Sequence, residues 1–215
     1  MEFEFKGHTL TLLPEKAVYK QDERLLVIAD VHLGKASHFR KHGISMPASS
    51  QYGDYQKLKE LVEKIQPHKV YFLGDLFHSS FNNDWHAFAS LIECCEDIEF
   101  TLIKGNHDII DYRLFDRLNI HVIDKHIEDE HFIYSHKPLD HIPDGKLNLA
   151  GHIHPGVCLH GLGKQSIKLP VFHLQDGNQM ILPAFGVLTG LYILGRNERT
   201  QLFVVLPNEV RELKR

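Results

Sequence analysis

The sequence predicts an α/β protein in which two β-sheets pack face to face and helices cover the outside. In the first half, short apolar runs alternate with amphipathic helical segments, which is typical of βαβ units. Beyond Ile123 the segments are short and β-rich, with Gly and Pro between them. The chain contains no internal repeat, low-complexity tract or linker. We therefore expect a single domain over residues 1–215 in which both halves share one core.

The first half begins with alternating apolar and polar residues at positions 1–19, which predict a hairpin at the sheet edge. The apolar run from Leu25 to Ala29 predicts a buried strand, and a basic loop is predicted from Lys35 to Pro47. Helical spacing of apolar residues predicts three helices, at residues 55–65, 84–95 and 109–118. Strands are predicted between and after them, at residues 70–73, 100–103 and 120–123.

The second half is predicted to be mostly sheet. Its strand-like segments lie at residues 131–135, 147–150, 169–174, 180–182, 191–194 and 201–206.

Composition narrows the class of protein. Hydrophobic residues make up 43% and charged residues 24% of the chain, as in ordinary globular proteins, which excludes disorder. The formal net charge of −4 predicts no broad attraction to nucleic acid or anionic membrane, although bound divalent ions would add local positive charge. Three cysteines form no disulfide framework. Without signal-peptide features or an apolar run of about 20 residues, we expect a cytoplasmic protein.

Polar motifs follow five of the apolar runs, where strands end and loops begin. They are Asp30-Val-His32, Gly74-Asp75-Leu-Phe-His78, Gly105-Asn106-His107-Asp108, His136 and Gly151-His152-Ile-His154. Each motif alone is a common turn or cap signal. Together, five motifs made of metal-binding residue types predict a ligand site at the edge of the sheet, where α/β proteins bind their ligands.

The residue types in these motifs suit divalent first-row metals, because mixed oxygen and imidazole ligands bind Mn, Fe or Zn. Gly74 permits a tight turn close to the ions, and the carboxylate of Asp75 beside it can bridge two of them. His107 is then free to act on the substrate. Its neighbour Asp108 is expected to hydrogen-bond the His107 ring, fix its tautomer and raise its pKa, as a proton donor requires.

The motif order resembles the calcineurin-like metallophosphoesterases, whose pattern matches residues 30–154. The resemblance implies a four-layer αββα sandwich with two mixed β-sheets and a dinuclear site. It implies that Asp75 is shared by two ions and that His107 is the general acid. The ligands implied for the first ion are Asp30, His32, Asp75 and His154, and for the second Asp75, Asn106, His136 and His152.

The same resemblance implies a phosphoesterase reaction in which a metal-bridged hydroxide attacks phosphorus in line. Two divalent ions lower the pKa of the bridging water and hold the phosphoryl oxygens, so no covalent protein nucleophile is needed. Mn is the expected metal. Fe and Zn remain alternatives, because all three metals accept these ligands.

Motif details look closest to nucleases of this family, in which the histidine three residues after the bridging Asp positions DNA; His78 inherits that role. Segments along nearly the whole chain, such as Asp30-Val-His-Leu-Gly-Lys-Ala36 and Leu182-Pro-Ala-Phe-Gly186, resemble the ligase-associated DNA damage response endonucleases of bacteria. That branch implies single-stranded DNA as substrate and a DNA ligase, a helicase and an exonuclease as partners. Lys137 departs from its pattern, since Gly is common there, and so does Leu191.

Other residues leave alternatives open. The basic loop from Lys35 to Lys41, with Lys164 and Lys168, either follows a phosphate backbone or is simply solvated. Phe77 and Phe81 either stack on bases or pack in the core. Two competing functions also remain, a phosphodiesterase for cyclic nucleotides or nucleotide esters and a non-catalytic scaffold of a repair complex.

Overall fold

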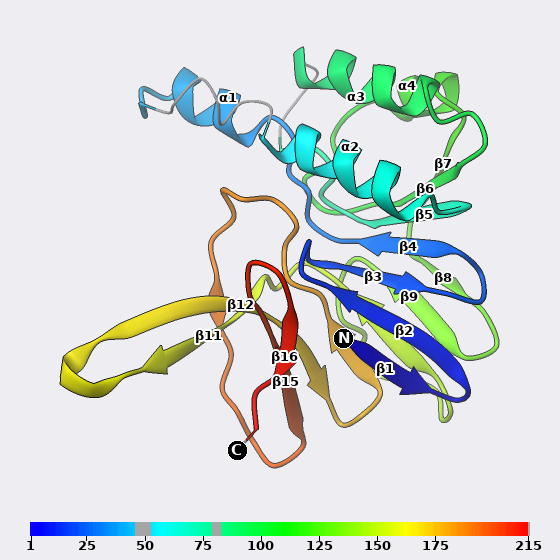
Figure 1. The fold of residues 1–215 in the computed structure, drawn as a ribbon. Helices are drawn as coiled ribbons and strands as arrows, with labels where there is room; N and C mark the ends of the chain where they lie inside the picture. Colours follow the sequence, from blue (N-terminus) through cyan, green and yellow to red (C-terminus); the bar gives the residue numbers. More distant parts are fainter. Residues whose placement is uncertain (46–52, 79–82, 215) are drawn as a thin grey trace.

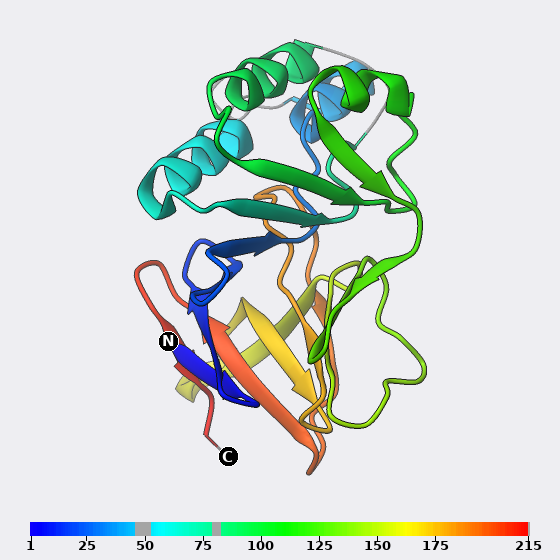
Figure 2. The same cartoon turned by 90° about the vertical axis from the view of Figure 1, so that its right-hand side faces the viewer.

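The computed structural model describes residues 1–45, 53–78 and 83–214, and consists of two β-sheets packed against each other with the described α-helices over the outer face of the first sheet (Figures 1 and 2). The predicted α/β class with two mixed sheets is confirmed. In the described ranges, no helix is long and apolar enough to cross a membrane.

The first sheet has seven strands whose order in space follows their order in the chain. The three N-terminal strands are antiparallel and form the predicted edge, and the four strands from β4 onward are parallel. Its strands are β1 (Glu2–Phe5), β2 (His8–Leu13), β3 (Ala17–Lys20), β4 (Leu25–Ile28), β5 (Lys69–Leu73), β6 (Glu99–Ile103) and β7 (Ile120–Ile123). Parallel strands end at one edge of the sheet, which brings the loops after β4, β5 and β6 together.

The helices of the described residues are α1 (Lys35–Lys41), α2 (Gly53–Ile65), α3 (Asn83–Glu93) and α4 (Tyr112–Arg117). Helix α1 corrects the prediction of a loop from Lys35 to Pro47, the last two residues of which lie outside the described part of the chain. Only Ala36 is buried in α1, so this seven-residue basic helix carries no apolar stripe that sequence periodicity could detect. Helix α4 starts three residues later than predicted, at Tyr112, after Asp111 caps it.

The second sheet has nine strands, three of which (β8, β11 and β16) were not predicted. β9, β10 and β13 are parallel neighbours, and β11 with β12 forms an antiparallel hairpin that extends away from the body as an arm (Figure 1). A short 3-10 turn, η2 (Leu162–Lys164), lies between the two arm strands. The strands are β8 (His126–Glu128), β9 (Phe132–Ser135), β10 (Leu147–Ala150), β11 (Pro155–His160), β12 (Ser166–Gln175), β13 (Gln179–Ile181), β14 (Tyr192–Ile193), β15 (Thr200–Val205) and β16 (Val210–Glu212).

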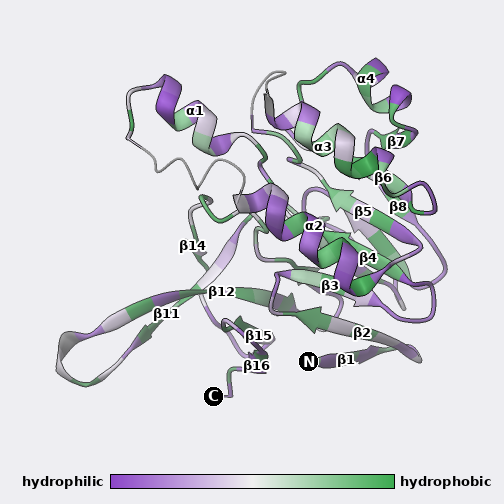
Figure 3. Cartoon of the chain, turned by 45° about the horizontal axis from the view of Figure 1, so that its top comes forward, coloured by the Kyte–Doolittle hydropathy of each residue, from purple (hydrophilic) through white to green (hydrophobic). Residues whose placement is uncertain are grey.

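Two apolar layers hold these elements together. Successive side chains of a strand point to opposite faces, so in β4 Leu26 and Ile28 belong to the core layer that includes α2, α3 and α4, whereas Leu25 and Val27 belong to the layer shared with the second sheet. Figure 3 shows the hydrophobic residues concentrated in strands such as β4 and β5. Phe77 belongs to the helix-side layer and is 1% exposed, which confirms core packing over base stacking; Phe81 lies outside the described residues.

Candidate metal centre

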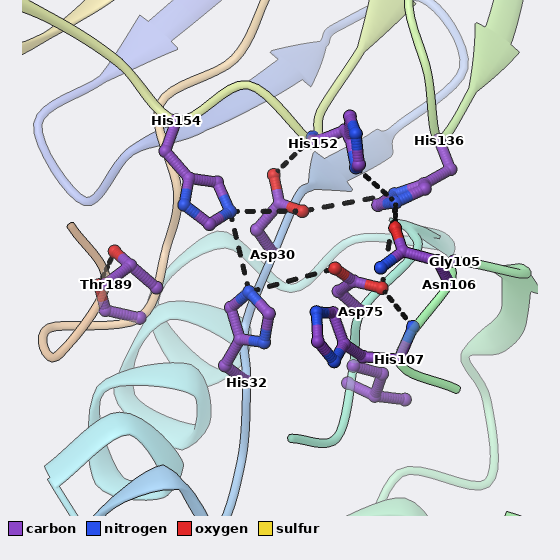
Figure 4. A network of polar contacts seen from close by, with 12 residues as sticks. Asp30, His32, Asp75, Gly105, Asn106, His107, His136, His152, His154 and Thr189 are labelled. Carbon is purple, nitrogen blue, oxygen red and sulfur yellow. Dashed lines mark hydrogen bonds and ion pairs between the residues drawn. The ribbon is translucent and has the colours of Figure 1, made fainter. Parts of the chain in front are cut away.

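The loops at the ends of the parallel strands of both sheets meet in one place and bring all seven predicted ligands together (Figure 4). Asp30 and His32 follow β4, Asp75 follows β5, and Asn106 follows β6 of the first sheet. The remaining three come from the second sheet: His136 follows β9, and His152 and His154 follow β10.

One cluster is formed by Asp30, His32 and His154, whose potential ligand atoms all lie within 4.8 Å of one another. The Nε2 atoms of His32 and His154 are 3.5 Å apart, and Nε2 of His154 is 3.6 Å from Oδ1 of Asp30. Asp30 and His32 are buried, and His154 closes the cluster from the side of the second sheet.

A second cluster is formed by Asp75, His136 and His152, again within 4.8 Å of one another. Nε2 of His136 lies 3.1 Å from Nδ1 of His152 and 3.1 Å from Oδ1 of Asn106, so the amide of Asn106 adjoins this cluster at its exposed rim. Nδ1 of His136 donates to the carbonyl of Leu73 at 2.9 Å, which leaves Nε2 as the atom that faces the cluster.

The carboxylate of Asp75 lies between the two clusters, as expected of a shared ligand. Its Oδ2 is 3.9 Å from Nε2 of His32, and its Oδ1 is 3.6 Å from Nε2 of His136. Each cluster thus combines residues of both sheets, and Asp75 connects them.

Glycines line the site where the backbones of different loops approach it closely. A Cβ atom on Gly74 would lie 2.2 Å from Nδ1 of His136, and one on Gly105 would lie 2.2 Å from Oδ1 of Asp75. A Cβ on Gly151 would lie 2.7 Å from Oδ2 of Asp30. Any larger residue at these positions would occupy space that the ligands need.

The backbone adopts the left-handed region at five of the seven predicted ligands. The φ angles are 54° at Asp30, 52° at His32, 50° at Asp75, 71° at His152 and 54° at His154. For a residue with a side chain this conformation costs on the order of 1 kcal/mol, and it persists where the surrounding structure holds it. Here the hydrogen bonds of the site loops do so, including one of 2.8 Å from the N–H of His152 to Oδ2 of Asp30.

The donor set fits divalent cations. Oδ1 of Asp30 and Nδ1 of His32 are buried and, within the described chain, have no hydrogen-bond partner. Burial, and then the nearby cation Lys35, lower the pKa of His32 to about 2, so its imidazole is neutral at pH 7 and can bind a metal. Carboxylate, amide and imidazole donors in one place suit Mn, Fe or Zn.

His107 lies beside the clusters and is exposed, as expected of a group that acts on the substrate. Its backbone N–H donates to Oδ1 of Asp75 at 2.9 Å. Its ring stacks at 25° on that of His78, with 5.6 Å between the ring centroids. His78 is half-buried, its Nδ1 has no hydrogen-bond partner in the described structure, and burial, followed by Lys35, lowers its pKa to about 4.

Asp108 does not orient the His107 ring, which corrects the sequence-based expectation. Its carboxylate points under the loops instead and accepts backbone N–H groups: Oδ2 binds Asp75 and Gly105 at 2.8 Å each, and Oδ1 binds Leu76 at 2.9 Å. Burial raises the pKa of Asp108, against the effect of these donors. The side chains of these adjacent residues therefore point in opposite directions, that of His107 toward solvent and that of Asp108 into the interior.

Sequence reasoning assigned no site role to the segment after β13, although Pro183-Ala-Phe-Gly186 contributed to the family resemblance. The N–H groups of Phe185 and Gly186 donate to the carbonyls of Ala29 and Asp30 at 2.9 and 3.1 Å, so this segment holds the loop after β4. Lys57 of α2 in turn donates to the carbonyl of Phe185 at 3.0 Å.

The fold and this site define a class. Residues 23–188 match the family model of the calcineurin-like phosphoesterases, and the chain belongs to that family. It is therefore a metal-dependent phosphoesterase.

Among solved structures, the crystal structure of the nuclease MPE of Pseudomonas putida is similar over the whole chain. The TM-score is 0.78 and the sequence identity 26%, and the match covers 99% of each chain. No curated protein matches the sequence.

Proposed function

We propose that the protein is a Mn-dependent DNA endonuclease that cleaves single-stranded DNA in bacterial DNA repair. The observation that carries the proposal is the pair of clusters that share Asp75, with His107 exposed beside them. The similarity to a nuclease over 99% of both chains supports DNA as substrate. The repair role, with a DNA ligase, a helicase and an exonuclease as partners, is supported by the sequence resemblance to the ligase-associated branch.

The proposed ligands divide between two ions that share Asp75. Asp30, His32 and His154 would hold the first with it, and Asn106, His136 and His152 the second. When bound, the ions supply Lewis acidity to the phosphoryl oxygens and an acidified water as the nucleophile. The chain's part is to hold seven donors in place, which its buried carboxylates and strained loops do before any substrate arrives.

We assign His107 as the general acid. Attack on phosphorus breaks the P–O bond on the opposite side, and the oxygen that leaves needs a proton. The His107 imidazole is exposed to incoming substrate, while its backbone is fixed to Asp75 at 2.9 Å. The stacked ring of His78 keeps the His107 ring near the clusters and is placed to contact the same substrate.

A direct assay decides the substrate class. Protein stripped with EDTA and reloaded with Mn, Fe or Zn should be inactive without metal and regain cleavage of single-stranded DNA best with Mn. Parallel reactions use bis-p-nitrophenyl phosphate and a cyclic nucleotide. Turnover of the small esters without cleavage of any DNA would instead establish the small-molecule phosphodiesterase. Metal binding without hydrolysis of any ester would instead support the non-catalytic scaffold.

The role of His107 can be tested separately through the leaving group. His107→Ala should lower kcat on DNA about 100-fold or more, as loss of a general acid does. The loss should be much smaller on bis-p-nitrophenyl phosphate, because p-nitrophenolate leaves without a proton. His121→Ala, an exposed histidine of β7, is the matched control. Equal losses on both substrates would contradict the assignment.

A further inference from the structure

Two grooves open beside the proposed second metal position and share a wall formed by Lys104, Gly105 and Asn106. The tyrosine groove, with a volume of about 620 Å³, continues from this wall along Ile109, Tyr112 and Arg113. The lysine groove, of about 480 Å³, continues along Lys125, His136 and Lys137. Both lie within the usual size range of ligand pockets, roughly 300–1,000 Å³, and each meets the site at Asn106.

The tyrosine groove exposes apolar side chains that are usually buried. Tyr112 is 52% exposed and Ile109 is 70% exposed. The Nζ of Lys104 lies over the Tyr112 ring, 4.6 Å from the ring centroid, so a cation and a half-exposed aromatic ring meet in this groove. An exposed aromatic ring can stack on an unpaired nucleobase, and the phosphates of that strand need cations nearby.

The lysine groove supplies positive charge, which is complementary to the phosphates of a nucleic acid. Lys125 and Lys137 are exposed and, in the ranges that the structure describes, make no ion pair. By contrast, Lys104 is 3.8 Å from Asp124, and Arg113 is paired with Asp111, so these two cations are already balanced. Lys137 directly follows His136 at the position where the family commonly has Gly. This departure places an unpaired positive charge next to the site.

We propose that the two grooves form one binding site for single-stranded nucleic acid next to the scissile phosphate. The base of the flanking nucleotide stacks on Tyr112, and the adjoining phosphates lie against Lys125 and Lys137. The proposal rests on the proposed function, and it adds which face of the molecule receives the strand. Only an unpaired base offers its face to a side chain, so the site favours single strands over duplex.

Tyr112→Ala tests the stacking contact. It should raise the Kd for single-stranded DNA about tenfold, as loss of one base–aromatic stack does, and Tyr112→Phe should not. The ratio of kcat/KM on DNA to that on bis-p-nitrophenyl phosphate should fall with it. The matched control is Tyr192→Ala, since Tyr192 is 62% exposed and lies on β14, beside His154 and outside the lining of both grooves. A loss in Tyr192→Ala and none in Tyr112→Ala would overturn the proposal.

An abasic substrate makes this test sharper. Oligonucleotides that lack the base next to the cleaved bond should bind the wild-type protein about as weakly as intact DNA binds Tyr112→Ala. The substitution should cause no further loss on the abasic strand, because both changes remove the same contact. Additive losses would mean that Tyr112 does not touch that base.

The lysines can be tested through salt dependence. Each phosphate contact on a single strand contributes about 0.7 to the slope of log Kd against log salt concentration. Lys125→Gln with Lys137→Gln should lower the slope by about 1.4, twice that contribution. Lys6→Gln, an exposed lysine in the turn after β1, should not change it. An unchanged slope in the double variant would refute the phosphate path.

Failure of this inference is distinguishable from failure of the proposed function. If the wild-type protein cleaves single-stranded DNA but neither groove variant changes binding, only the groove assignment fails. If it hydrolyses bis-p-nitrophenyl phosphate and neither binds nor cleaves DNA, the DNA function fails and the groove proposal with it.

Discussion

The backbone N–H of Asp75 donates a 2.8 Å hydrogen bond to Oδ2 of Asp108, 33 positions further along the chain. The same oxygen accepts from Gly105 at 2.8 Å. One buried carboxylate thereby joins the loop after β5 to the loop after β6. The residue that connects the two clusters is held in place by a residue that faces away from both.

Asp108→Ala should destabilise the protein, because the backbone N–H groups of Asp75, Leu76, Phe77 and Gly105 would lose a charged acceptor. We expect a loss of about 3–5 kcal/mol, or about 10 °C in Tm, with activity falling in parallel. Thermal unfolding followed by circular dichroism measures it. Asp111→Ala, which removes the cap of α4 and an exposed ion pair with Arg113, should cost about 1 kcal/mol. A fully stable but inactive Asp108→Ala protein would mean that Asp108 acts in the chemistry.

Asp75→Asn should lose metal as well as activity. The substitution keeps the shape of the side chain but removes the charge that both clusters share. Mutation of a residue that only hydrogen-bonds a metal ligand typically lowers metal affinity or activity about 10- to 100-fold. Loss of a ligand itself should therefore lower kcat/KM at least about 100-fold. Metal content per chain, measured by mass spectrometry, should drop from two toward one. The control is Asp144→Asn, an exposed turn residue; full metal content in Asp75→Asn would contradict the bridging role.

Gly105→Ala should impair the site through one methyl group. Its Cβ would lie 2.2 Å from Oδ1 and 2.4 Å from the backbone N of Asp75, so the loop after β5 would have to shift. We expect weaker metal binding by isothermal titration and an activity loss of about 100-fold, as displacement of about 1 Å in a site can cause. Gly195→Ala meets no atom within 4 Å and should behave as wild type. Wild-type activity of Gly105→Ala would show that the loop is not rigid.

Lys57 should make stability rise with pH. Burial, and then repulsion from Lys16, lower the pKa of Lys57 from 10.5 to about 7. Between these values the native state has released the proton that the unfolded chain keeps, so unfolding takes up a proton and becomes less favourable as pH increases. The urea midpoint should therefore rise between about pH 7 and pH 10, and rise less in Lys57→Met. Lys59→Met, on the same helix with its side chain 42% exposed, should keep the wild-type rise.

Sequence reasoning located the buried strands and the seven predicted ligands because both have local signals. Each strand is an apolar run, and each ligand follows one directly, as Asp30 follows Ile28 and Ala29. Helix α1 carries no such signal, since burial of Ala36 alone leaves no periodic stripe. Strand β11 begins at Pro155, a residue that argues against a strand by propensity, and it forms through pairing with β12 and β14.

The sequence-based prediction for Asp108 is wrong because adjacency in the sequence does not determine where a side chain points. Its partners, Asp75 and Leu76, are more than 30 positions away and become neighbours only when β5 and β6 pair. The left-handed backbone at Asp30 and His32 was equally hidden, because only a few per cent of non-glycine residues adopt it, even though Asp and His do so more often than most. Tertiary packing imposes both features.

Division of each cluster between the two sheets has a consequence for biogenesis. The chain up to β7 contains Asp30, His32 and Asp75, but both clusters lack their imidazoles from the second sheet until residue 154 has been synthesised and β10 has docked. A nascent or partly unfolded chain is therefore a poor chelator and an inactive hydrolase. Metal bound by the proposed ligands would load late and would stabilise the docked state by mass action, so that hydrolytic capacity would appear only in correctly assembled molecules.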